Sequence, residues 1–448
     1  MVTNKAAVTK KSDSDLVKND AGFEIAPFRG VRYNTNGAGE KADLKSVTSP
    51  PYDVISPEEH RHLLESSPYN ITRLTLGLDP SDSASYEERG DLLRKWMEEG
   101  VLVADRDPCL YVYTIDYAQP AGSLATGTEQ RARFLGLMAL GKLHPFSDGI
   151  VLPHEKTFPK VVDDRYRLLD ATRTNLESIF LLYSDPERVI DGILEARTRK
   201  PPIASVEAKP GEFHALHRIS DLAVFIRLIE LLGRQRPIIA DGHHRYTTSL
   251  RYWREGPGGA KRVPGSEWQM MTLANLYGDG LSILATHRLV TLRSGPTPAR
   301  ARVDEALAVL LSKFERVEEN EKAERDLVVE TRDKRFCVRF PAVLKGSRSG
   351  AAQTAYGLLH EVVLTEWLGK LVDADAVRYF KEGTGELEAL RRGEGDILFR
   401  MKPVGARDFQ GVVQGGEVLP HKTTYFYPKL WSGLVLWPLE EPERPALK

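Results

Sequence analysis

The chain contains few cysteines. Among 448 residues there are two, Cys109 and Cys337, and they are far apart in the sequence. Zinc sites and redox-active dithiols need cysteines spaced a few residues apart, so neither kind of site is expected. Two separated cysteines suit a reducing compartment, and we expect a cytoplasmic location.

Long apolar runs and a net charge are also missing. No run approaches the roughly 18 to 20 residues of a membrane span, and the first residues lack the apolar core of a signal peptide. The 62 basic and 63 acidic residues give a formal net charge of -1. Because a near-zero charge produces no global field toward nucleic acid or anionic lipid, neither is an expected partner.

Three well-known catalytic signatures are absent as well. The sequence has no Gly-x-x-x-x-Gly-Lys-Ser/Thr phosphate loop, no His-Glu-x-x-His zinc helix and no Gly-x-Ser-x-Gly nucleophile turn. These absences disfavour P-loop nucleotide hydrolases, zinc hydrolases and serine hydrolases. No group of residues has the spacing of metal ligands, so no metal-binding residue is predicted.

The length of the chain predicts more than one domain. Helical and strand patterns are intermixed, which predicts an α+β fold with mixed sheets, flanking helices and a two-lobed architecture. Residues 1–22 are polar and are predicted to be a disordered tail. A Gly- and Pro-rich stretch at residues 256–265 separates an N-terminal domain, residues 23–262, from a C-terminal domain, residues 263–448, that packs against it.

Local signals place several elements. Ser56-Pro57 followed by two glutamates predicts a helix that runs to about Ser66. The segment from Ile71 to Leu76 alternates like a strand. Leu110 to Tyr117 and Arg131 to Leu140 are two further strands, and the Gly-, Ser- and Thr-rich stretch between them predicts a hairpin.

The strongest local signal is Asp241-Gly242-His243-His244-Arg245, which we call the 241–245 turn. An apolar run precedes it and a helical pattern follows it to Trp253, so we expect a strand, a turn and a helix. The free N–H groups and the dipole of a helix N-terminus favour an anion, and Arg245 adds a bidentate donor for phosphate. The alternative is an ordinary turn in which Asp241 caps the helix.

Two more segments carry ionisable residues. His154, Glu155 and Lys156 lie in a long stretch, residues 144–173, whose interspersed apolar residues argue against disorder. Thr286-His287-Arg288, the 286–288 segment, ends a strand and offers groups that contact anions. Taken singly, each is more often explained as a solvated surface. Because the 241–245 turn needs a partner wall to complete a reaction, we expect the three segments to converge in space.

Four motifs follow one another along the chain. They are Pro50-Pro51-Tyr52-Asp53-Val54-Ile55, the 241–245 turn with Tyr246, Thr286-His287-Arg288, and Pro420-His421-Lys422-Thr423-Thr424-Tyr425-Phe426-Tyr427-Pro428-Lys429. In this order they resemble the motifs of a bacterial family known as domain of unknown function 1015. The resemblance spans nearly the whole chain from about Phe23 and implies a link to serine biosynthesis.

The 241–245 turn also resembles the nucleotide-binding signature of the ParB and sulfiredoxin superfamily, which includes a free serine kinase that uses ADP. The resemblance implies a ParB/sulfiredoxin-like nucleotide-binding element embedded in the larger fold. Sulfiredoxin chemistry needs a cysteine within this signature, and the turn has none. DNA partition of the ParB kind needs a helix-turn-helix domain and a basic face, and neither is evident.

The resemblance implies roles for individual residues. Asp241 is the expected acid or base, the amides of the turn are expected to hold phosphate, and Glu155 and Asp53 are candidates for a second acid. The expected catalytic residues are Asp241, His244 and Glu155, and the expected nucleotide contacts are Gly242, His243, Arg245, His154, Lys156, His287 and Arg288.

The resulting hypothesis is phosphoryl transfer between a nucleotide and a small hydroxyl substrate, with ADP or ATP and Mg2+ as cofactors. Serine and phosphoserine are the favoured pair, as in a serine kinase or a phosphoserine phosphatase. The alternative is a non-catalytic regulatory protein that binds a nucleotide. The expected partners are small molecules, with no nucleic acid and no membrane, and a homodimer stays open.

Overall fold

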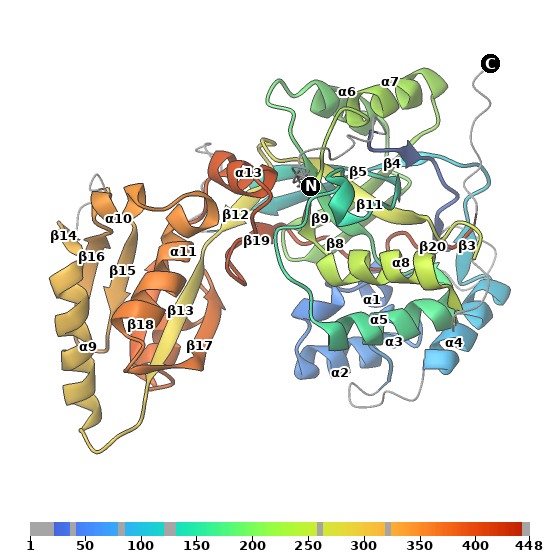
Figure 1. Cartoon of the computed structure of the whole chain (residues 1–448). Coiled ribbons are helices and arrows are strands. Elements are labelled where there is room, and N and C mark those ends of the chain that lie inside the picture. The colour runs from blue at the N-terminus through green and yellow to red at the C-terminus, as the bar shows by residue number, and fades with distance from the viewer. Residues whose placement is uncertain are drawn as a thin grey trace, which may run out of the picture.

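One mixed sheet and one antiparallel sheet, each with flanking helices, confirm the α+β class, and each sheet forms the centre of one lobe in Figure 1. The predicted tail lies outside the described residues except for Gly22. No helix among the described residues is both long and apolar enough to cross a membrane. The computed structural model describes residues 22–35, 42–78, 86–120, 131–257, 263–318 and 324–440.

The larger lobe is built on an eight-stranded sheet in the order β10-β7-β11-β5-β4-β9-β8, with β1 paired to β5. Neighbours are antiparallel except β11 and β7, which are parallel, and β4 with β5 forms the predicted hairpin. The predicted division after residue 262 precedes β11, so this sheet takes strands from both sides of it. The strands are β1 (Ile25–Ala26), β4 (Leu110–Ala118), β5 (Arg131–Lys142), β7 (Ile179–Tyr183), β8 (Ala204–Lys209), β9 (Glu212–Ile219), β10 (Ile238–Asp241) and β11 (Trp268–Asn275).

Helices and two short strand pairs surround this sheet. In Figure 1, α6 and α7 lie together on one side, and α5 and α8 lie side by side on the other. The helices and 3-10 turns are α1 (Leu44–Val47), η1 (Tyr52–Val54), α2 (Pro57–Ser66), α3 (Thr72–Thr75), α4 (Tyr86–Glu98), η2 (Phe146–Asp148), α5 (Pro159–Thr172), α6 (Val189–Thr198), α7 (Leu222–Leu232) and α8 (His243–Glu255). The pairs are β2 (Val31–Tyr33) with β3 (Leu102–Ala104), and β6 (Thr174–Asn175) with β20 (Trp437–Pro438).

Two local predictions in this lobe have opposite outcomes. Helix α2 begins as predicted, because the hydroxyl of Ser56 accepts a hydrogen bond from the N–H of Glu59. The strand predicted from Ile71 to Leu76 is wrong, since this segment contains the helical turn α3. The side chain of Asn70 accepts a hydrogen bond from the N–H of Thr72 at 3.0 Å, and such local bonds favour turns over strands.

Apolar side chains cover both faces of the larger sheet. Along β5, Leu137 and Ala139 belong to one core cluster, whereas Met138 and Leu140 belong to the other, as the two-residue period of a strand requires. Each fully buried leucine contributes roughly 1.5–3 kcal/mol. The sheet is therefore a rigid platform, and its edge strand β10 leads directly into the 241–245 turn.

The smaller lobe is built on a six-stranded antiparallel sheet in the order β14-β16-β15-β18-β13-β17. Its strands are β13 (Thr286–Leu292), β14 (Glu315–Val317), β15 (Leu327–Glu330), β16 (Arg335–Arg339), β17 (Val372–Lys381) and β18 (Ile397–Met401). Its helices are α9 (Ala299–Lys313), α10 (Ala342–Gly346), the 3-10 turn η4 (Gly350–Gln353), α11 (Ala355–Leu358), the π-helix η5 (Leu359–Trp367), α12 (Glu386–Arg391) and α13 (Ala406–Gln414).

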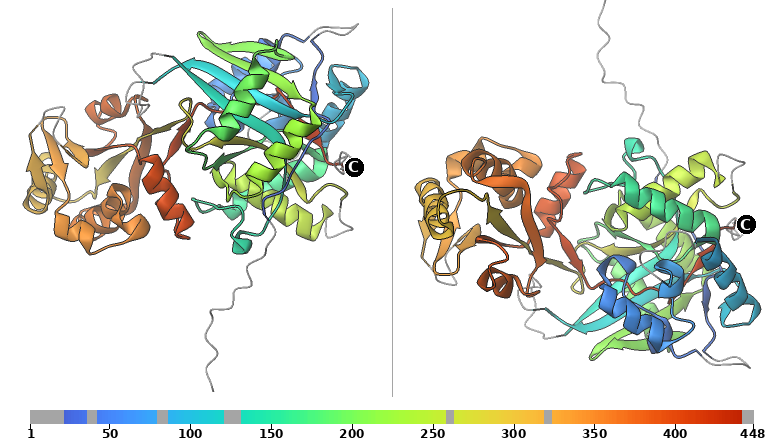
Figure 2. Two further views of the ribbon diagram at one scale, coloured as in Figure 1. Left: turned by 90° about the horizontal axis from the view of Figure 1, so that it is seen from above. Right: turned by 90° about the horizontal axis from the view of Figure 1, so that it is seen from below.

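The chain passes between the lobes twice. Strand β12 (Ser282–Leu284) leads into β13, β19 (Tyr425–Tyr427) leads back, and the two strands pair antiparallel. Residues 419–440, the returning segment, then run along the larger lobe, where Ser432 pairs with Ser49 and Leu436 with Val31. Figure 2 shows the two lobes side by side from above and from below.

Candidate functional site

A cavity of about 520 Å³ is lined by residues of both lobes. The larger lobe contributes the η1 turn, His154 and Glu155, and the 241–245 turn. The smaller lobe contributes Thr286 and the end of β17, and the returning segment contributes residues between 421 and 429. Residues from all three segments that were expected to converge therefore line one cavity.

The 241–245 turn has the strand-turn-helix structure that its sequence predicts. Gly242 is the N-cap of α8 with a φ of 92°, and no side chain caps the helix. A left-handed φ of this kind favours glycine. Asp241 does not act as the cap, since no side chain hydrogen-bonds to the first amides of α8; one oxygen of its carboxylate instead accepts a hydrogen bond from Nζ of Lys429 at 2.7 Å. The first amides of α8 are therefore left for another acceptor, and the helix dipole favours an anion at this place.

Two carboxylates in the cavity have opposite pKa shifts. Burial alone would raise the pKa of Asp241, but the charges of Lys429 and Arg245 outweigh it and hold that pKa far below its ordinary value. Asp53 lines the cavity and keeps an exposed surface, yet burial by surrounding protein atoms and the charge of Asp241 raise its pKa to about 6. Asp241 is thus a fixed anion, whereas Asp53 gains and loses a proton near neutral pH.

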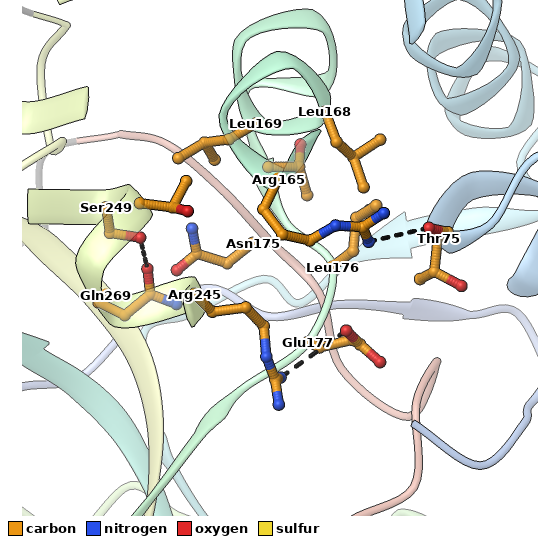
Figure 3. A pocket seen from close by; sticks show the side chains of 12 residues that line it. Thr75, Arg165, Leu168, Leu169, Asn175, Leu176, Glu177, Arg245, Ser249 and Gln269 are labelled. Atoms are coloured by element: carbon orange, nitrogen blue, oxygen red, sulfur yellow. Dashed lines mark hydrogen bonds and ion pairs between the residues drawn. The ribbon is translucent and has the colours of Figure 1, made fainter. Parts of the chain in front are cut away.

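Arg245 is less free than its sequence position suggests. Its Nη1 donates a hydrogen bond to the carbonyl oxygen of Ser178 at 2.7 Å and lies 3.7 Å from a carboxylate oxygen of Glu177. Its Nε is buried without a hydrogen-bond partner among the described residues. The side chain also lines a second pocket of about 50 Å³ (Figure 3), which has room for a few water molecules. Part of the guanidinium, rather than the whole fork, remains for a ligand.

The histidines of the site connect its walls. The N–H of His154 donates to Nε2 of His243 at 3.2 Å, and the ring of His154 bonds to the carbonyl of Ile239 and the hydroxyl of Thr424. The N–H of Phe158 donates to Nε2 of His244 at 3.1 Å. Burial lowers the pKa of all three imidazoles, so they are neutral groups that fix the geometry rather than cations that attract phosphate.

Glu155 and Lys156, the other two candidate residues of the stretch 144–173, lie at different positions relative to the cavity. A carboxylate oxygen of Glu155 accepts a hydrogen bond from the N–H of Lys422 at 3.2 Å, and Glu155 lines the cavity. Lys156 is exposed and is not among the lining residues. The structure thus brings Glu155 to the site but leaves Lys156 outside it.

Arg288 was expected to contact the nucleotide, and its environment contradicts this. Its guanidinium lies over the rings of Tyr356 and Tyr379, at 4.5 and 5.2 Å from their centroids. Its nitrogens donate to Nε2 of His360, to both oxygens of Thr286 and to the carbonyls of residues 421 and 422. Burial lowers its pKa to about 10. Since its donors are engaged, Arg288 supports the returning segment instead of holding phosphate.

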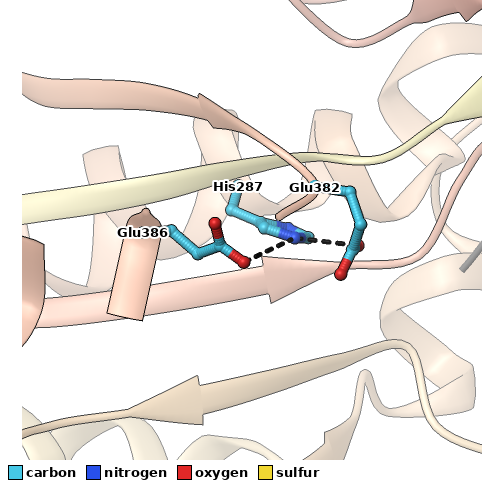
Figure 4. A group of neighbouring side chains, drawn as sticks. All are labelled: His287, Glu382 and Glu386. Atoms are coloured by element: carbon cyan, nitrogen blue, oxygen red, sulfur yellow. Dashed lines mark ion pairs between the residues drawn. The ribbon is translucent and has the colours of Figure 1, made fainter. Parts of the chain in front are cut away.

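His287 lies on the opposite face of β13 from Thr286 and Arg288, as strand alternation requires. Its Nδ1 accepts a hydrogen bond from the N–H of Met401, and its Nε2 lies 2.9 Å from Glu382 and 4.0 Å from Glu386 (Figure 4). The expectation that His287 contacts the nucleotide is therefore wrong, because the residue faces the interior of the smaller lobe.

The trio of His287, Glu382 and Glu386 has the spacing of a metal site. A histidine that binds a metal through one ring nitrogen normally donates a proton from the other. Here Nδ1 accepts the N–H of Met401, so a neutral ring carries its proton on Nε2 and points it at the glutamates. A protonated Nε2 has no lone pair to offer a metal ion, although this atom has no hydrogen-bond partner among the described residues.

The returning segment brings further functional groups to the cavity. Tyr425 and the buried Phe426 both line it. The ammonium groups of Lys429 and Lys381 lie 4.7 and 4.3 Å from the centroid of the Tyr425 ring. The available signal was the density of polar and cationic residues in the fourth motif. Lys381, at the end of β17, had no sequence signal.

Comparison with known proteins gives one clear assignment. A family model described as protein of unknown function, DUF1015, matches residues 25–353. The chain belongs to this family. The resemblance identified from the four motifs is confirmed, although the fourth motif lies beyond the matched residues. No curated protein matches the chain.

Solved structures that resemble this DUF1015 protein have low TM-scores. A conserved hypothetical protein from Pyrococcus furiosus has a TM-score of 0.30 and 14% identity, covering 65% of this chain and 90% of that one. A free serine kinase in complex with AMP has a TM-score of 0.33 and 14% identity, covering 65% and 88%. SbnI with a C-terminal truncation, from Staphylococcus aureus, has a TM-score of 0.36 and 13% identity, covering 67% and 87%.

Proposed function

We propose that this protein transfers a phosphoryl group between a nucleotide and a small hydroxyl substrate, with serine and phosphoserine as the favoured pair. One observation carries the proposal. The uncapped N-terminus of α8, which favours an anion, lines the same cavity as Asp53, whose pKa of about 6 suits proton transfer near neutral pH. An anion site next to a carboxylate of this kind is what phosphoryl transfer to a hydroxyl requires.

Asp53 is the base in this proposal, in place of Asp241. At pH 7 most Asp53 side chains are ionised and can accept the proton of the attacking hydroxyl. The hydroxyl oxygen then forms a bond to the terminal phosphorus while the bond to the bridging oxygen of the nucleotide breaks. Asp241 keeps its charge and orients Lys429 through their hydrogen bond. The reverse reaction uses the same groups, with Asp53 as the acid.

The carboxylates of the cavity suit Mg2+, which prefers oxygen ligands. Asp241 and Glu155 each have one carboxylate oxygen without a hydrogen bond among the described residues. These two side chains would hold the ion, and when bound it would neutralise phosphate charge. The backbone amides at the start of α8 would bind phosphate oxygens directly.

The test is an assay for phosphoserine formed from serine with ADP or ATP, together with the reverse reaction. Asp53→Asn should lower the rate by about 10²–10⁴ while nucleotide binding, measured by calorimetry, persists. Asp107→Asn is the matched control, since Asp107 is exposed and does not line the cavity. Nucleotide binding by the wild type without turnover of either substrate would contradict catalysis and favour the regulatory alternative. Full activity of Asp53→Asn would remove Asp53 as the base.

A further inference from the structure

Two lysines of the cavity share one aromatic ring but differ in their partners. Lys429 lies 4.7 Å from the centroid of the Tyr425 ring, and its Nζ is hydrogen-bonded to Asp241 at 2.7 Å. Lys381 lies 4.3 Å from the same centroid. Within the described part of the chain, its ammonium has no hydrogen bond and no ion pair. One cation of the pair is therefore neutralised and the other is not.

The surroundings of Lys381 destabilise its charged form. Burial and the neighbouring charge of Lys429 lower its pKa, although Asp53 and Asp241 partly offset them. A cation over an aromatic ring gains some stabilisation from it, but repulsion between two ammonium groups near one ring remains. An anion that contacts Lys381 would relieve this repulsion and supply the missing hydrogen-bond acceptor.

The position of Lys381 restricts which anion it can contact. Lys381 is the last residue of β17 in the smaller lobe, where it pairs with Thr286 of β13. The charge of Asp53, which also lines the cavity, acts on it to raise its pKa. If Asp53 takes a proton from the attacking hydroxyl, the phosphorus under attack lies next to that hydroxyl. The phosphoryl group closest to Lys381 is then the one that is transferred.

We propose that Lys381 binds the terminal phosphate of the nucleotide and forms, with the 241–245 turn, a phosphate subsite that bridges the two lobes. The assignment rests on the proposed function, because it takes the transferred group to be a nucleotide phosphate. A nucleoside diphosphate or triphosphate fills this subsite. A nucleoside monophosphate, whose single phosphate lies nearer the base and sugar, leaves it empty.

The experiment compares binding of ADP, AMP and inorganic pyrophosphate to the full chain by calorimetry. Lys381→Met should weaken ADP and pyrophosphate binding by about ten- to a hundredfold, the size expected for one hydrogen bond between charged groups, and leave AMP binding unchanged. Lys381→Arg should restore most of the affinity. Lys370→Met is the matched control, because Lys370 is an exposed lysine outside the cavity. Thermal denaturation of each variant establishes that it is folded.

The possible outcomes distinguish failure of the Lys381 subsite from failure of the proposed function. Unchanged ADP binding by Lys381→Met, or an equal loss of ADP and AMP binding, overturns the terminal-phosphate assignment while nucleotide binding stands. If the wild type binds pyrophosphate through Lys381 but binds no nucleotide, the anion subsite stands and the proposed function fails. Absence of both pyrophosphate and nucleotide binding overturns both.

Discussion

The 241–245 turn and the 286–288 segment contain the same kinds of residue and have opposite roles. Both place histidine beside arginine at the boundary of a strand, and both were expected to contact phosphate. The turn lines the cavity and leaves the first amides of α8 uncapped. In the 286–288 segment, His287 faces the interior of the smaller lobe. The guanidinium of Arg288 donates its hydrogen bonds to backbone carbonyls and to His360.

The difference follows from the kind of element that each sequence enters. A helix N-terminus has backbone donors without an intrahelical partner, so a turn that precedes it keeps binding capacity. A strand in the interior of a sheet satisfies its own backbone, and its alternation sends neighbouring side chains to opposite faces. Residue type alone therefore does not distinguish an anion site from a structural cluster. The distinction depends on whether the residues lie at a helix N-terminus or within a strand of a sheet.

The largest expected effect is a loss of stability when Arg288 of the 286–288 segment is replaced. Arg288→Met should lower the free energy of unfolding by about 3 kcal/mol, because it leaves the carbonyls of Thr286, His421 and Lys422 without a buried donor. Urea denaturation measures the change. Arg293→Met is the control, since Arg293 pairs with Asp373 at the surface and such pairs contribute about 0–1 kcal/mol. A loss of nucleotide affinity without a loss of stability would mean that Arg288 is a ligand.

A smaller effect is expected at the turn itself. Gly242→Ala places a side chain at a φ of 92°, which costs about 1–2 kcal/mol, and its Cβ would lie 3.2 Å from Nη2 of Arg245. We expect a lower melting temperature and weaker nucleotide binding. Gly411→Ala in α13 should stabilise the protein by about 0.5–1 kcal/mol instead, because nothing lies within 4 Å of the added Cβ. The same sign for both substitutions would contradict the special role of Gly242.

The pH dependence should identify the titrating group of the cavity. The raised pKa of Asp53, about 6, predicts a rate that rises with pH through about 6 and then levels, falling about tenfold per unit below it. Burial lowers the pKa values of His243 and His244 below their ordinary range, so the imidazoles titrate at lower pH than a free histidine. Asp53→Asn should abolish the step in the pH–rate profile. A step that persists in this variant would assign it to another group.

The same pKa shift has a second, smaller consequence, for stability. Because the folded state binds the Asp53 proton more tightly than the unfolded state, stability from this group is full below the unfolded pKa of about 4 and is lost as pH rises through about 6. Asp53→Asn should therefore flatten the decline of stability over this window. Denaturation at several pH values measures it, and an unchanged slope would contradict the shift.

Local signals account for the parts of the fold that the sequence predicts well. The N-cap of Ser56, the hairpin of β4 and β5, and the strand-turn-helix around Gly242 depend on neighbouring residues and are confirmed. The strand predicted from Ile71 to Leu76 fails because alternation over six residues was outweighed by the hydrogen bond of Asn70. Short apolar patterns predict element type poorly when a polar neighbour bonds to the backbone.

Only part of the candidate site could be predicted from local sequence signals. Asp241 and Gly242 could be chosen because their signal is contiguous in sequence. Lys429 reaches Asp241 across 188 positions, and Lys381 meets Tyr425 through the packing of two lobes. The raised pKa of Asp53 likewise depends on burial and on the neighbouring charge of Asp241, and both arise only in the folded chain. Groups whose chemistry arises from long-range contacts need the folded structure.

The pairing of β12 with β19 restricts how the lobes can move. A single connecting strand would let the smaller lobe swivel in any direction. Two antiparallel strands joined by backbone hydrogen bonds resist shear and sideways bending, so the softest motion is a twist about the axis of the ribbon. Such a twist would carry Lys381 along an arc relative to the start of α8 and would change the width of the cavity without disturbing either sheet.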